Sequence, residues 1–152
     1  MDKRVLTIQD ISCVGQCSLT VALPIISACG IETAILPSSV LSNHTAKGYS
    51  GWTFCDLTDE MPKILERWQK ENIDFSAFYT GYVSKSQIPH ILDIMEKTAR
   101  PNALKVVDPA MADNGKLYAG FDDDFPNEMK KLCAKADVLI PNLTEASLLL
   151  GV

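Results

Sequence analysis

The stretches FSAFYTG (75–81), KSQIPHILDIMEKTAR (85–100) and ALKVVD (103–108) follow one another along the chain and decide the fold. The first and third are short and apolar and predict buried strands, whereas the middle stretch has apolar side chains at helical spacing. Strands that are separated by a helix of this length pair in parallel through a right-handed crossover. These residues therefore predict one strand–helix–strand unit of a parallel sheet.

The same alternation extends in both directions from this unit. It predicts further strands at 4–9, 33–37 and 137–141, and further helices at 18–29, 57–72, 124–136 and from 142 onward. Ser18 and Thr58 stand where N-caps are expected, and Pro24 lies inside the first helix, where a proline disfavours regular geometry. The pattern predicts a single-domain, doubly wound α/β fold with a mainly parallel sheet and helices on both faces. An extended excursion near 42–56 is expected to form a small flap.

Composition and motifs exclude several classes of protein. The net charge of −5 argues against nucleic acid as the main partner, because phosphate binding needs a basic face. No run of 18 apolar residues predicts a membrane span, and the N-terminus lacks a signal-peptide pattern. Five cysteines without paired CxxC spacing favour reduced thiols and a cytoplasmic location. A Walker phosphate loop, a GxGxxG turn after the first strand and a GxSxG elbow are all absent from the sequence.

Polar side chains follow all five predicted strands, at the edge where open parallel sheets bind ligands. In chain order they are Asp10, Ser12, Ser42, Asn43, His44, Thr45, Thr80, Tyr82, Asp108, Asp113, Asn142, Thr144 and Glu145. Each also has a structural explanation: Asp10 and Ser12 suit turn hydrogen bonds, and Asn142 with Glu145 matches a helix-capping box. Because so many functional groups share one predicted edge, we expect a ligand site there.

Four of these segments resemble one protein family. SNHT (42–45), TGY (80–82), DPAMADNGKLY (108–118) and PNLTEA (141–146) are similar to motifs of pyridoxal and pyridoxamine kinases in the ribokinase superfamily. The last two are shared with hydroxymethylpyrimidine kinases of thiamine synthesis, whereas the first two favour the vitamin B6 branch. The resemblance runs from about residue 5 to residue 151. It implies a ribokinase-like fold and ATP-dependent phosphorylation of the 5′-hydroxymethyl group of pyridoxal, pyridoxamine or pyridoxine.

The resemblance also implies a role for each matching position. Asp10 or Ser12 would bind the pyridine ring substituents, Thr45 would contact the ring, and His44 and Tyr82 would shape the walls around it. The nucleotide would be held at a second group of residues, which comprises Asp108, Asn142 and Glu145, with Asp108 and Glu145 serving the metal. The implied cofactors are ATP and Mg²⁺, together with a monovalent cation such as K⁺ in some relatives. Family members are usually homodimers whose flap contributes to the contact.

The sequence departs from the family pattern in one respect. Members carry in their second half a G-[TS]-G-D segment whose Asp is the catalytic base, and no such segment occurs in these 152 residues. The resemblance thus indicates the N-terminal half of a kinase domain, with the C-terminal half absent. We expect this polypeptide alone to be inactive and its last strand to have an unpaired edge. Three alternatives remain open: a hydroxymethylpyrimidine kinase, a non-catalytic B6-binding module, and a plain α/β scaffold.

Overall fold

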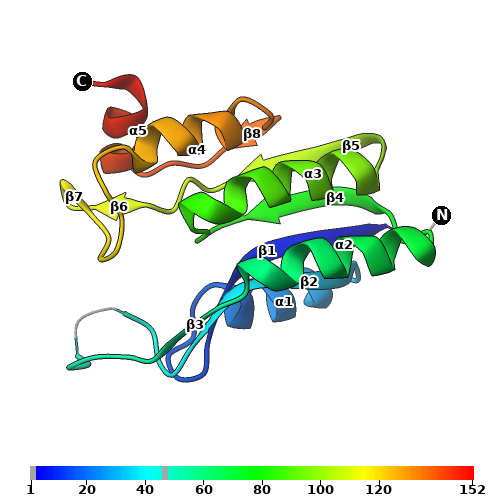
Figure 1. Cartoon of the computed structure of the whole chain (residues 1–152), viewed down its shortest axis with the longest axis horizontal. Coiled ribbons are helices and arrows are strands. Elements are labelled where there is room, and N and C mark those ends of the chain that lie inside the picture. The colour runs from blue at the N-terminus through cyan, green and yellow to red at the C-terminus, as the bar shows by residue number, and fades with distance from the viewer. Residues whose placement is uncertain (1–2, 46–47) are drawn as a thin grey trace.

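The computed structural model describes residues 3–45 and 48–152, and within them six strands form one sheet in the order β3-β2-β1-β4-β5-β8 (Figure 1). All neighbouring pairs are parallel except β2 with β3. The strands are β1 (Arg4–Ser12), β2 (Glu32–Leu41), β3 (Phe54–Asp56), β4 (Phe75–Thr80), β5 (Ala99–Val107) and β8 (Val138–Leu139). The chain moves from β1 outward to β2 and then returns to β4 on the other side of β1, which creates a topological switch point beside β1.

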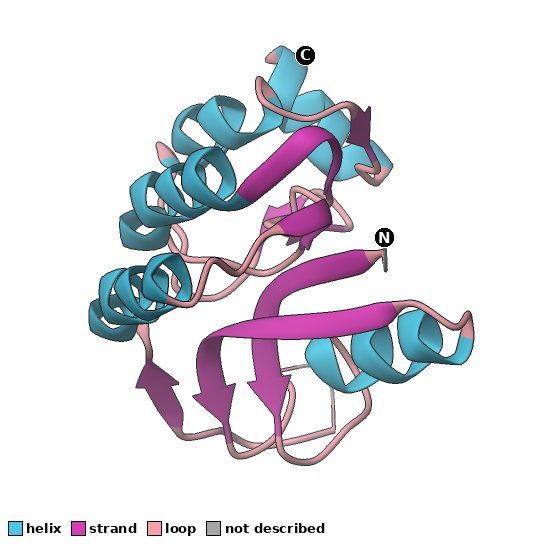
Figure 2. Ribbon diagram, turned by 90° about the vertical axis from the view of Figure 1, so that its right-hand side faces the viewer, coloured by secondary structure: helices cyan, strands magenta, loops and turns pink. Residues whose placement is uncertain are grey.

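Helices cover both faces of this sheet unequally (Figure 2). The helix α1 (Leu19–Ala28) packs on one face against β1 and β2. A layer of neighbouring helices on the other face consists of α2 (Met61–Lys70), α3 (Ile88–Thr98) and α4 (Phe125–Cys133), with α5 (Leu143–Leu150) beside α4. Two 3₁₀ turns, η1 (Thr58–Glu60) and η2 (Lys85–Gln87), lead into α2 and α3. The predicted doubly wound α/β fold with a mainly parallel sheet is confirmed.

The hydrophobic core lies between the sheet and the α2–α4 layer. Strand residues such as Leu6, Ile8 and Phe78 are fully buried there against Ile91 of α3 and Met129 of α4. Because side chains alternate along a strand, the intervening residues of β1 and β4 point to the α1 face. Several of these are polar, so the sheet has an apolar face that holds the fold together and a more polar face beside α1.

Two predicted N-caps are wrong in detail. Ser18 stands directly before α1 with a φ of 51°, outside the extended region of a capping residue, and its side chain makes no capping hydrogen bond. Thr58 lies inside η1, and its backbone N–H donates to Asp56 Oδ1 at 2.7 Å. Asp56, two residues upstream, thus accepts the hydrogen bond from the first N–H group of η1, and Thr58 does not act as the cap.

The predicted flap and the predicted sheet edge both take a defined form. After β2 the chain turns back, and β3 pairs antiparallel with the end of β2, although Ala46 and Lys47 of the flap lie outside the described residues. At the opposite edge, β8 has no further strand beside it within the described chain, and Val138, Leu139 and Ile140 are exposed. The unpaired edge is therefore confirmed. All five cysteines are free thiols, and no described helix is long and apolar enough to cross a membrane.

Candidate active site

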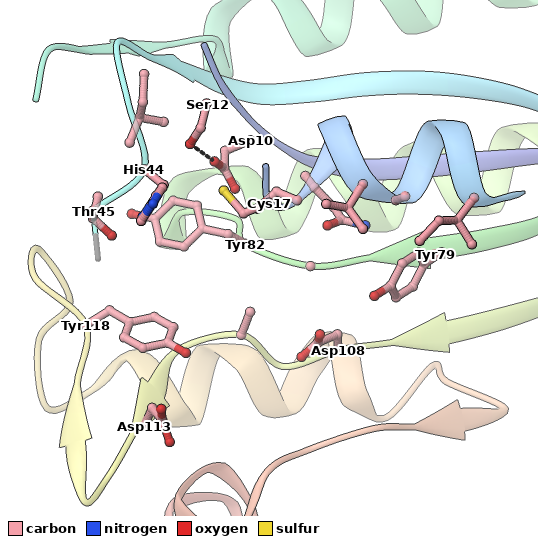
Figure 3. A pocket seen from close by; sticks show the side chains of 18 of the residues that line it. Asp10, Ser12, Cys17, His44, Thr45, Tyr79, Tyr82, Asp108, Asp113 and Tyr118 are labelled. Carbon is pink, nitrogen blue, oxygen red and sulfur yellow. Dashed lines mark hydrogen bonds between the residues drawn. The ribbon is translucent and has the colours of Figure 1, made fainter. Parts of the chain in front are cut away.

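A cavity of about 700 Å³ lies at the carboxyl ends of β1, β2, β4 and β5, beside α1 (Figure 3). Its lining includes six of the eight residues that the sequence predicts for substrate or nucleotide, namely Asp10, Ser12, His44, Thr45, Tyr82 and Asp108. Figure 3 shows the side chains of Asp10, Ser12 and His44 facing Asp108 and Tyr118 across the space. The structure thus brings together residues that are up to about 100 positions apart in the chain, as the strand-end rule predicts.

Asp10 and Ser12 end β1 as a pair of hydrogen-bond acceptors. The Asp10 side chain is buried, with 6% of the residue exposed, and the Ser12 hydroxyl donates to Asp10 Oδ2 at 3.3 Å. Among the described residues, no group donates a hydrogen bond to Asp10 Oδ1. A buried carboxylate normally has several donors around it, so this one is under-satisfied by the chain. The pair therefore offers oxygen lone pairs to whatever occupies the cavity.

The polar residues of the loop after β2 have two roles: some hold the loop in shape, and others line the cavity. Ser42 Oγ donates to Asn43 Oδ1 at 2.8 Å, and Asn43 Nδ2 donates to the carbonyls of His44 and Gly51 at 3.1 Å each. These two side chains hold the loop in shape. His44 and Thr45 instead line the cavity, as the sequence predicts.

Gly15 allows the β1–α1 loop to approach His44 closely. The His44 backbone N–H donates to the Val14 carbonyl at 3.0 Å, which draws the two loops together. Gly15 has a φ of +87°, and a Cβ atom built there would lie 1.8 Å from His44 Cδ2. The His44 ring also packs edge-on against Tyr49, with centroids 5.1 Å apart. Two separate requirements, the left-handed backbone and the missing side chain, therefore call for glycine beside this cavity wall.

Tyr82 forms another wall through a chain of stacked rings. It is half-buried and stacks on Phe121, which stacks in turn on Phe125, a fully buried residue of α4, at centroid distances of 5.2 and 3.8 Å. Burial raises the pKa of Tyr82, and the negative charges of Asp10 and Asp56 raise it further. Tyr82 also lines a second cavity of about 640 Å³ beside the flap, so its ring stands between the two spaces.

Asp108 supplies a carboxylate with an unusual proton affinity. Burial raises its pKa to about 6, and the nearby negative charge of Glu145 contributes to the increase. No ion pair with another described residue neutralises Asp108. Burial raises the pKa values of Tyr79 and Tyr118, and the negative charge of Asp108 raises both further. The site near β5 is therefore rich in negative charge, which favours a bound cation.

Asn142 and Glu145 do not line the cavity and instead hold backbone together. Asn142 Oδ1 accepts from the Glu145 N–H at 2.9 Å, while Glu145 Oε2 accepts from the Asn142 N–H at 2.9 Å. Glu145 Oε1 accepts from the Met111 N–H at 3.1 Å, and Asn142 Nδ2 donates to the Ala112 carbonyl at 2.8 Å. The capping-box explanation is thus confirmed. A role for these two residues toward nucleotide stays a prediction.

Several cavity residues were missed by sequence reasoning. The apolar wall comes from α1, and the remaining missed residues include Cys17, Tyr79 and Tyr118. Alternation along β4 could have placed Tyr79 opposite the core residue Phe78. Tyr118 follows a hairpin formed by β6 (Ala112–Asp113) and β7 (Lys116–Leu117), with positive φ values at Asn114 and Gly115. An Asn-Gly pair is the strongest short-range hairpin signal, and it is the feature of the sequence that could have located Tyr118.

Comparisons with known proteins address the identity of this site. No protein-family model matches the chain. A curated relative, the pyridoxal kinase of Dictyostelium discoideum, is 32% identical over 160 residues, which cover 100% of this chain and 51% of the relative. The chain is homologous to pyridoxal kinases over about half of their length. It fits the N-terminal half of a pyridoxal kinase.

Solved structures give the same picture of the pyridoxal kinase fold. A Bacteroides thetaiotaomicron protein assigned as a phosphomethylpyrimidine kinase, determined with pyridoxal, is 46% identical with a TM-score of 0.94 and matches 99% of this chain and 52% of its own. The pyridoxal kinase of Leishmania donovani, in complex with ADP and pyridoxamine, is 26% identical with a TM-score of 0.83; the match covers 97% of this chain and 54% of that one. The chain spans about half the length of these relatives.

Proposed function

We propose that this chain is the substrate-binding part of a kinase that transfers a phosphoryl group from ATP to the 5′-hydroxymethyl group of a B6 vitamer. The observation that carries the proposal is the cavity shared by Asp10, Ser12, His44, Thr45, Tyr82 and Asp108. Support comes from the pyridoxal kinase relatives, one of which binds ADP with pyridoxamine. The alternative of a plain scaffold is disfavoured, because the Asp10 carboxylate takes little part in holding the chain together.

The vitamer ring would lie between α1 and the strand ends. Asp10 and Ser12 would accept hydrogen bonds from ring substituents, and His44 and Thr45 would stand along the ring edge. Tyr82 would supply an aromatic surface, and the apolar side chains of α1, such as Val21 and Ile25, would complete the enclosure. A flat polar heteroaromatic ring needs such a combination of apolar faces and a few polar groups at its rim.

The reaction implies Mg²⁺ with the nucleotide, and the donor set near β5 fits this ion. Asp108 is a carboxylate without a neutralising partner, and hard cations prefer oxygen ligands of this kind. Asp108 would hold the ion, while Glu145, whose two oxygens already accept backbone N–H groups, would add negative charge. Bound Mg²⁺ supplies neutralisation of phosphate charge. No group of three His, Cys, Asp or Glu that could form a metal site by itself occurs among the described residues.

We further propose that this polypeptide by itself does not turn over substrate. In the family that the sequence resembles, the catalytic base is the Asp of a G-[TS]-G-D segment. This segment does not occur in the 152 residues. A bound vitamer would be positioned by the chain, but its hydroxyl proton would have no acceptor of that kind. Steady-state ADP release that depends on pyridoxal, measured with the 152-residue polypeptide, would contradict this proposal.

Titration calorimetry with pyridoxal tests the binding role directly. We expect saturable binding at a single site, weakened at least about tenfold by Thr45→Ala or Tyr82→Ala, because each removes part of a cavity wall. Thr53→Ala is the matched control, since Thr53 is exposed in the flap and does not line the cavity. Equal binding by all these variants would support the plain-scaffold alternative instead.

A second substrate class is favoured by one observation, the name of the Bacteroides relative. Hydroxymethylpyrimidine has a six-membered aromatic ring of nearly the same size as pyridine, with an amino group that could also donate to Asp10. Competition calorimetry with both compounds separates the two: stronger displacement by the pyrimidine than by pyridoxamine would favour the thiamine branch. A homodimer through the flap also stays a prediction, which sedimentation velocity would measure.

A further inference from the structure

The cavity has an unbalanced charge. Its described lining includes the carboxylates of Asp10, Asp108 and Asp113 and contains no lysine or arginine. Lys85, which lines the adjoining cavity, is paired with Asp124 at 2.7 Å and Asp122 at 3.6 Å. The negative charge acts on both sides of the cavity: besides burial, which is the larger cause, Asp10 raises the pKa of Tyr82 and Asp108 raises that of Tyr79. A ligand that enters this space therefore meets a field that favours positive charge.

The hydrogen-bonding groups at the end of β1 have the same bias. The Ser12 hydroxyl hydrogen is directed to Asp10, which leaves lone pairs on Ser12 Oγ and on both Asp10 oxygens. Gln9, which is also buried and lines the cavity, directs its Nε2 to Thr7 Oγ1 at 2.9 Å and leaves its carbonyl oxygen without a described donor. This corner of the cavity thus presents acceptors. A ligand group that binds here has to bring N–H or O–H donors, and a charged donor binds most strongly.

We propose that the cavity selects its vitamer by charge, with Asp10 as the specificity-determining residue, so that an aminomethyl vitamer binds more tightly than its hydroxymethyl counterpart. Pyridoxamine and pyridoxine have nearly the same size and differ at the 4′ position, where one carries an ammonium and the other a hydroxyl. Pyridoxic acid carries a carboxylate there and meets repulsion. The inference rests on the proposed function, because it takes this cavity as the vitamer site.

Asp10 is assigned this role rather than Asp108 for two reasons. Only 6% of the Asp10 residue is exposed, and Oδ1 has no donor among the described residues, so this oxygen is available to a ligand in the cavity. Asp108 lies at the end of β5, where bound Mg²⁺ and nucleotide would neutralise it. The charge of Asp10 remains effective when the nucleotide is present, and the preference for a cation should persist under those conditions.

The test is titration calorimetry of the full chain with pyridoxamine, pyridoxine and pyridoxic acid at neutral pH. We expect pyridoxamine to bind about tenfold more tightly than pyridoxine, and pyridoxic acid more weakly than either. Asp10→Asn keeps the shape and removes the charge, and it should bring the pyridoxamine and pyridoxine affinities to within about twofold. Asp123→Asn is the matched control, because Asp123 is exposed, lies outside the cavity and has no side-chain hydrogen bond to another described residue. It should keep the full preference.

The outcomes separate this inference from the proposed function. Equal affinities of the natural chain for all three compounds would overturn the charge selection while leaving the vitamer site in place. A tenfold preference that survives in Asp10→Asn would overturn the assignment to Asp10. Failure of every vitamer to bind would overturn the proposed function itself. Should Asp10→Asn not fold, as judged by its thermal transition, the three-ligand series with the natural chain still decides the inference.

Discussion

The ends of β1 and β2 and the ends of β5 and β8 carry similar polar side chains but use them differently. Glu145, 2% exposed, accepts two backbone N–H groups and takes part in a capping box. Asp10, 6% exposed, receives a single long hydrogen bond from Ser12. Two buried carboxylates at one edge of a sheet thus have opposite roles, one bound to the chain and the other open to a cavity. Their hydrogen-bond partners distinguish them: the capping-box motif predicts the contact of Glu145 with Asn142 but not the one with Met111.

The largest expected effect is on the β5–β8 side. Glu145→Ala removes two acceptors and leaves the Met111 and Asn142 N–H groups without their partners. An unsatisfied buried donor costs about 1–3 kcal/mol, so we expect the free energy of unfolding to fall by about 3 kcal/mol. Urea denaturation followed by circular dichroism measures it. Glu96→Ala is the control, because Glu96 is exposed on α3 and its side chain makes no hydrogen bond to another described residue; it should change stability by less than about 0.5 kcal/mol.

The second effect sharpens the comparison from the β1–β2 side. Gly15→Ala places a methyl group where the His44 ring lies and imposes a left-handed backbone on alanine. We expect the strain to cost about 1–2 kcal/mol of stability, and the displaced His44 to weaken pyridoxal binding about tenfold. Gly120→Ala has a similar φ of +92° but open space around the new Cβ atom. It should show the stability loss without the loss of binding; an equal loss of binding in both variants would argue against His44 as a cavity wall.

The third prediction concerns Asp108 and pH. Its pKa is raised to about 6, so the folded chain holds the proton more tightly than the unfolded chain does. Stability therefore falls as the pH rises from about 4 to about 6, and the cost is fully present above that range. Because Asp108 is only partly buried, we expect Asp108→Asn to stabilise the chain by about 1 kcal/mol at neutral pH. Paired urea titrations at neutral pH and near pH 4 should show the gain disappear in acid; a constant gain would contradict the assigned cause.

The sequence was sufficient to predict the fold. It was not sufficient to predict which polar side chains of the site bind backbone and which face the cavity. Period-two strands and period-3.6 helices such as 75–81 and 85–100 depend on local patterns, which is why they were predicted correctly. The rule for strand ends brought Asp10, His44 and Asp108 to one edge. Whether a polar side chain is already bound by backbone depends on neighbours far away, such as Met111 for Glu145, and no local pattern contains that information. The α1 wall was missed for the same reason.

The smallest expected effect gives the most direct test of the comparison. Asp10→Asn retains an oxygen that can accept from Ser12 and removes a buried charge that the chain does little to satisfy. We expect the free energy of unfolding to change by less than about 0.5 kcal/mol, because the lost hydrogen bond is weak and desolvation of a carboxylate is no longer required. Urea denaturation alongside Glu145→Gln measures the contrast. A loss for Asp10→Asn as large as that for Glu145→Gln would mean that both carboxylates serve the fold, because a group held ready for a ligand contributes little to stability while the cavity is empty.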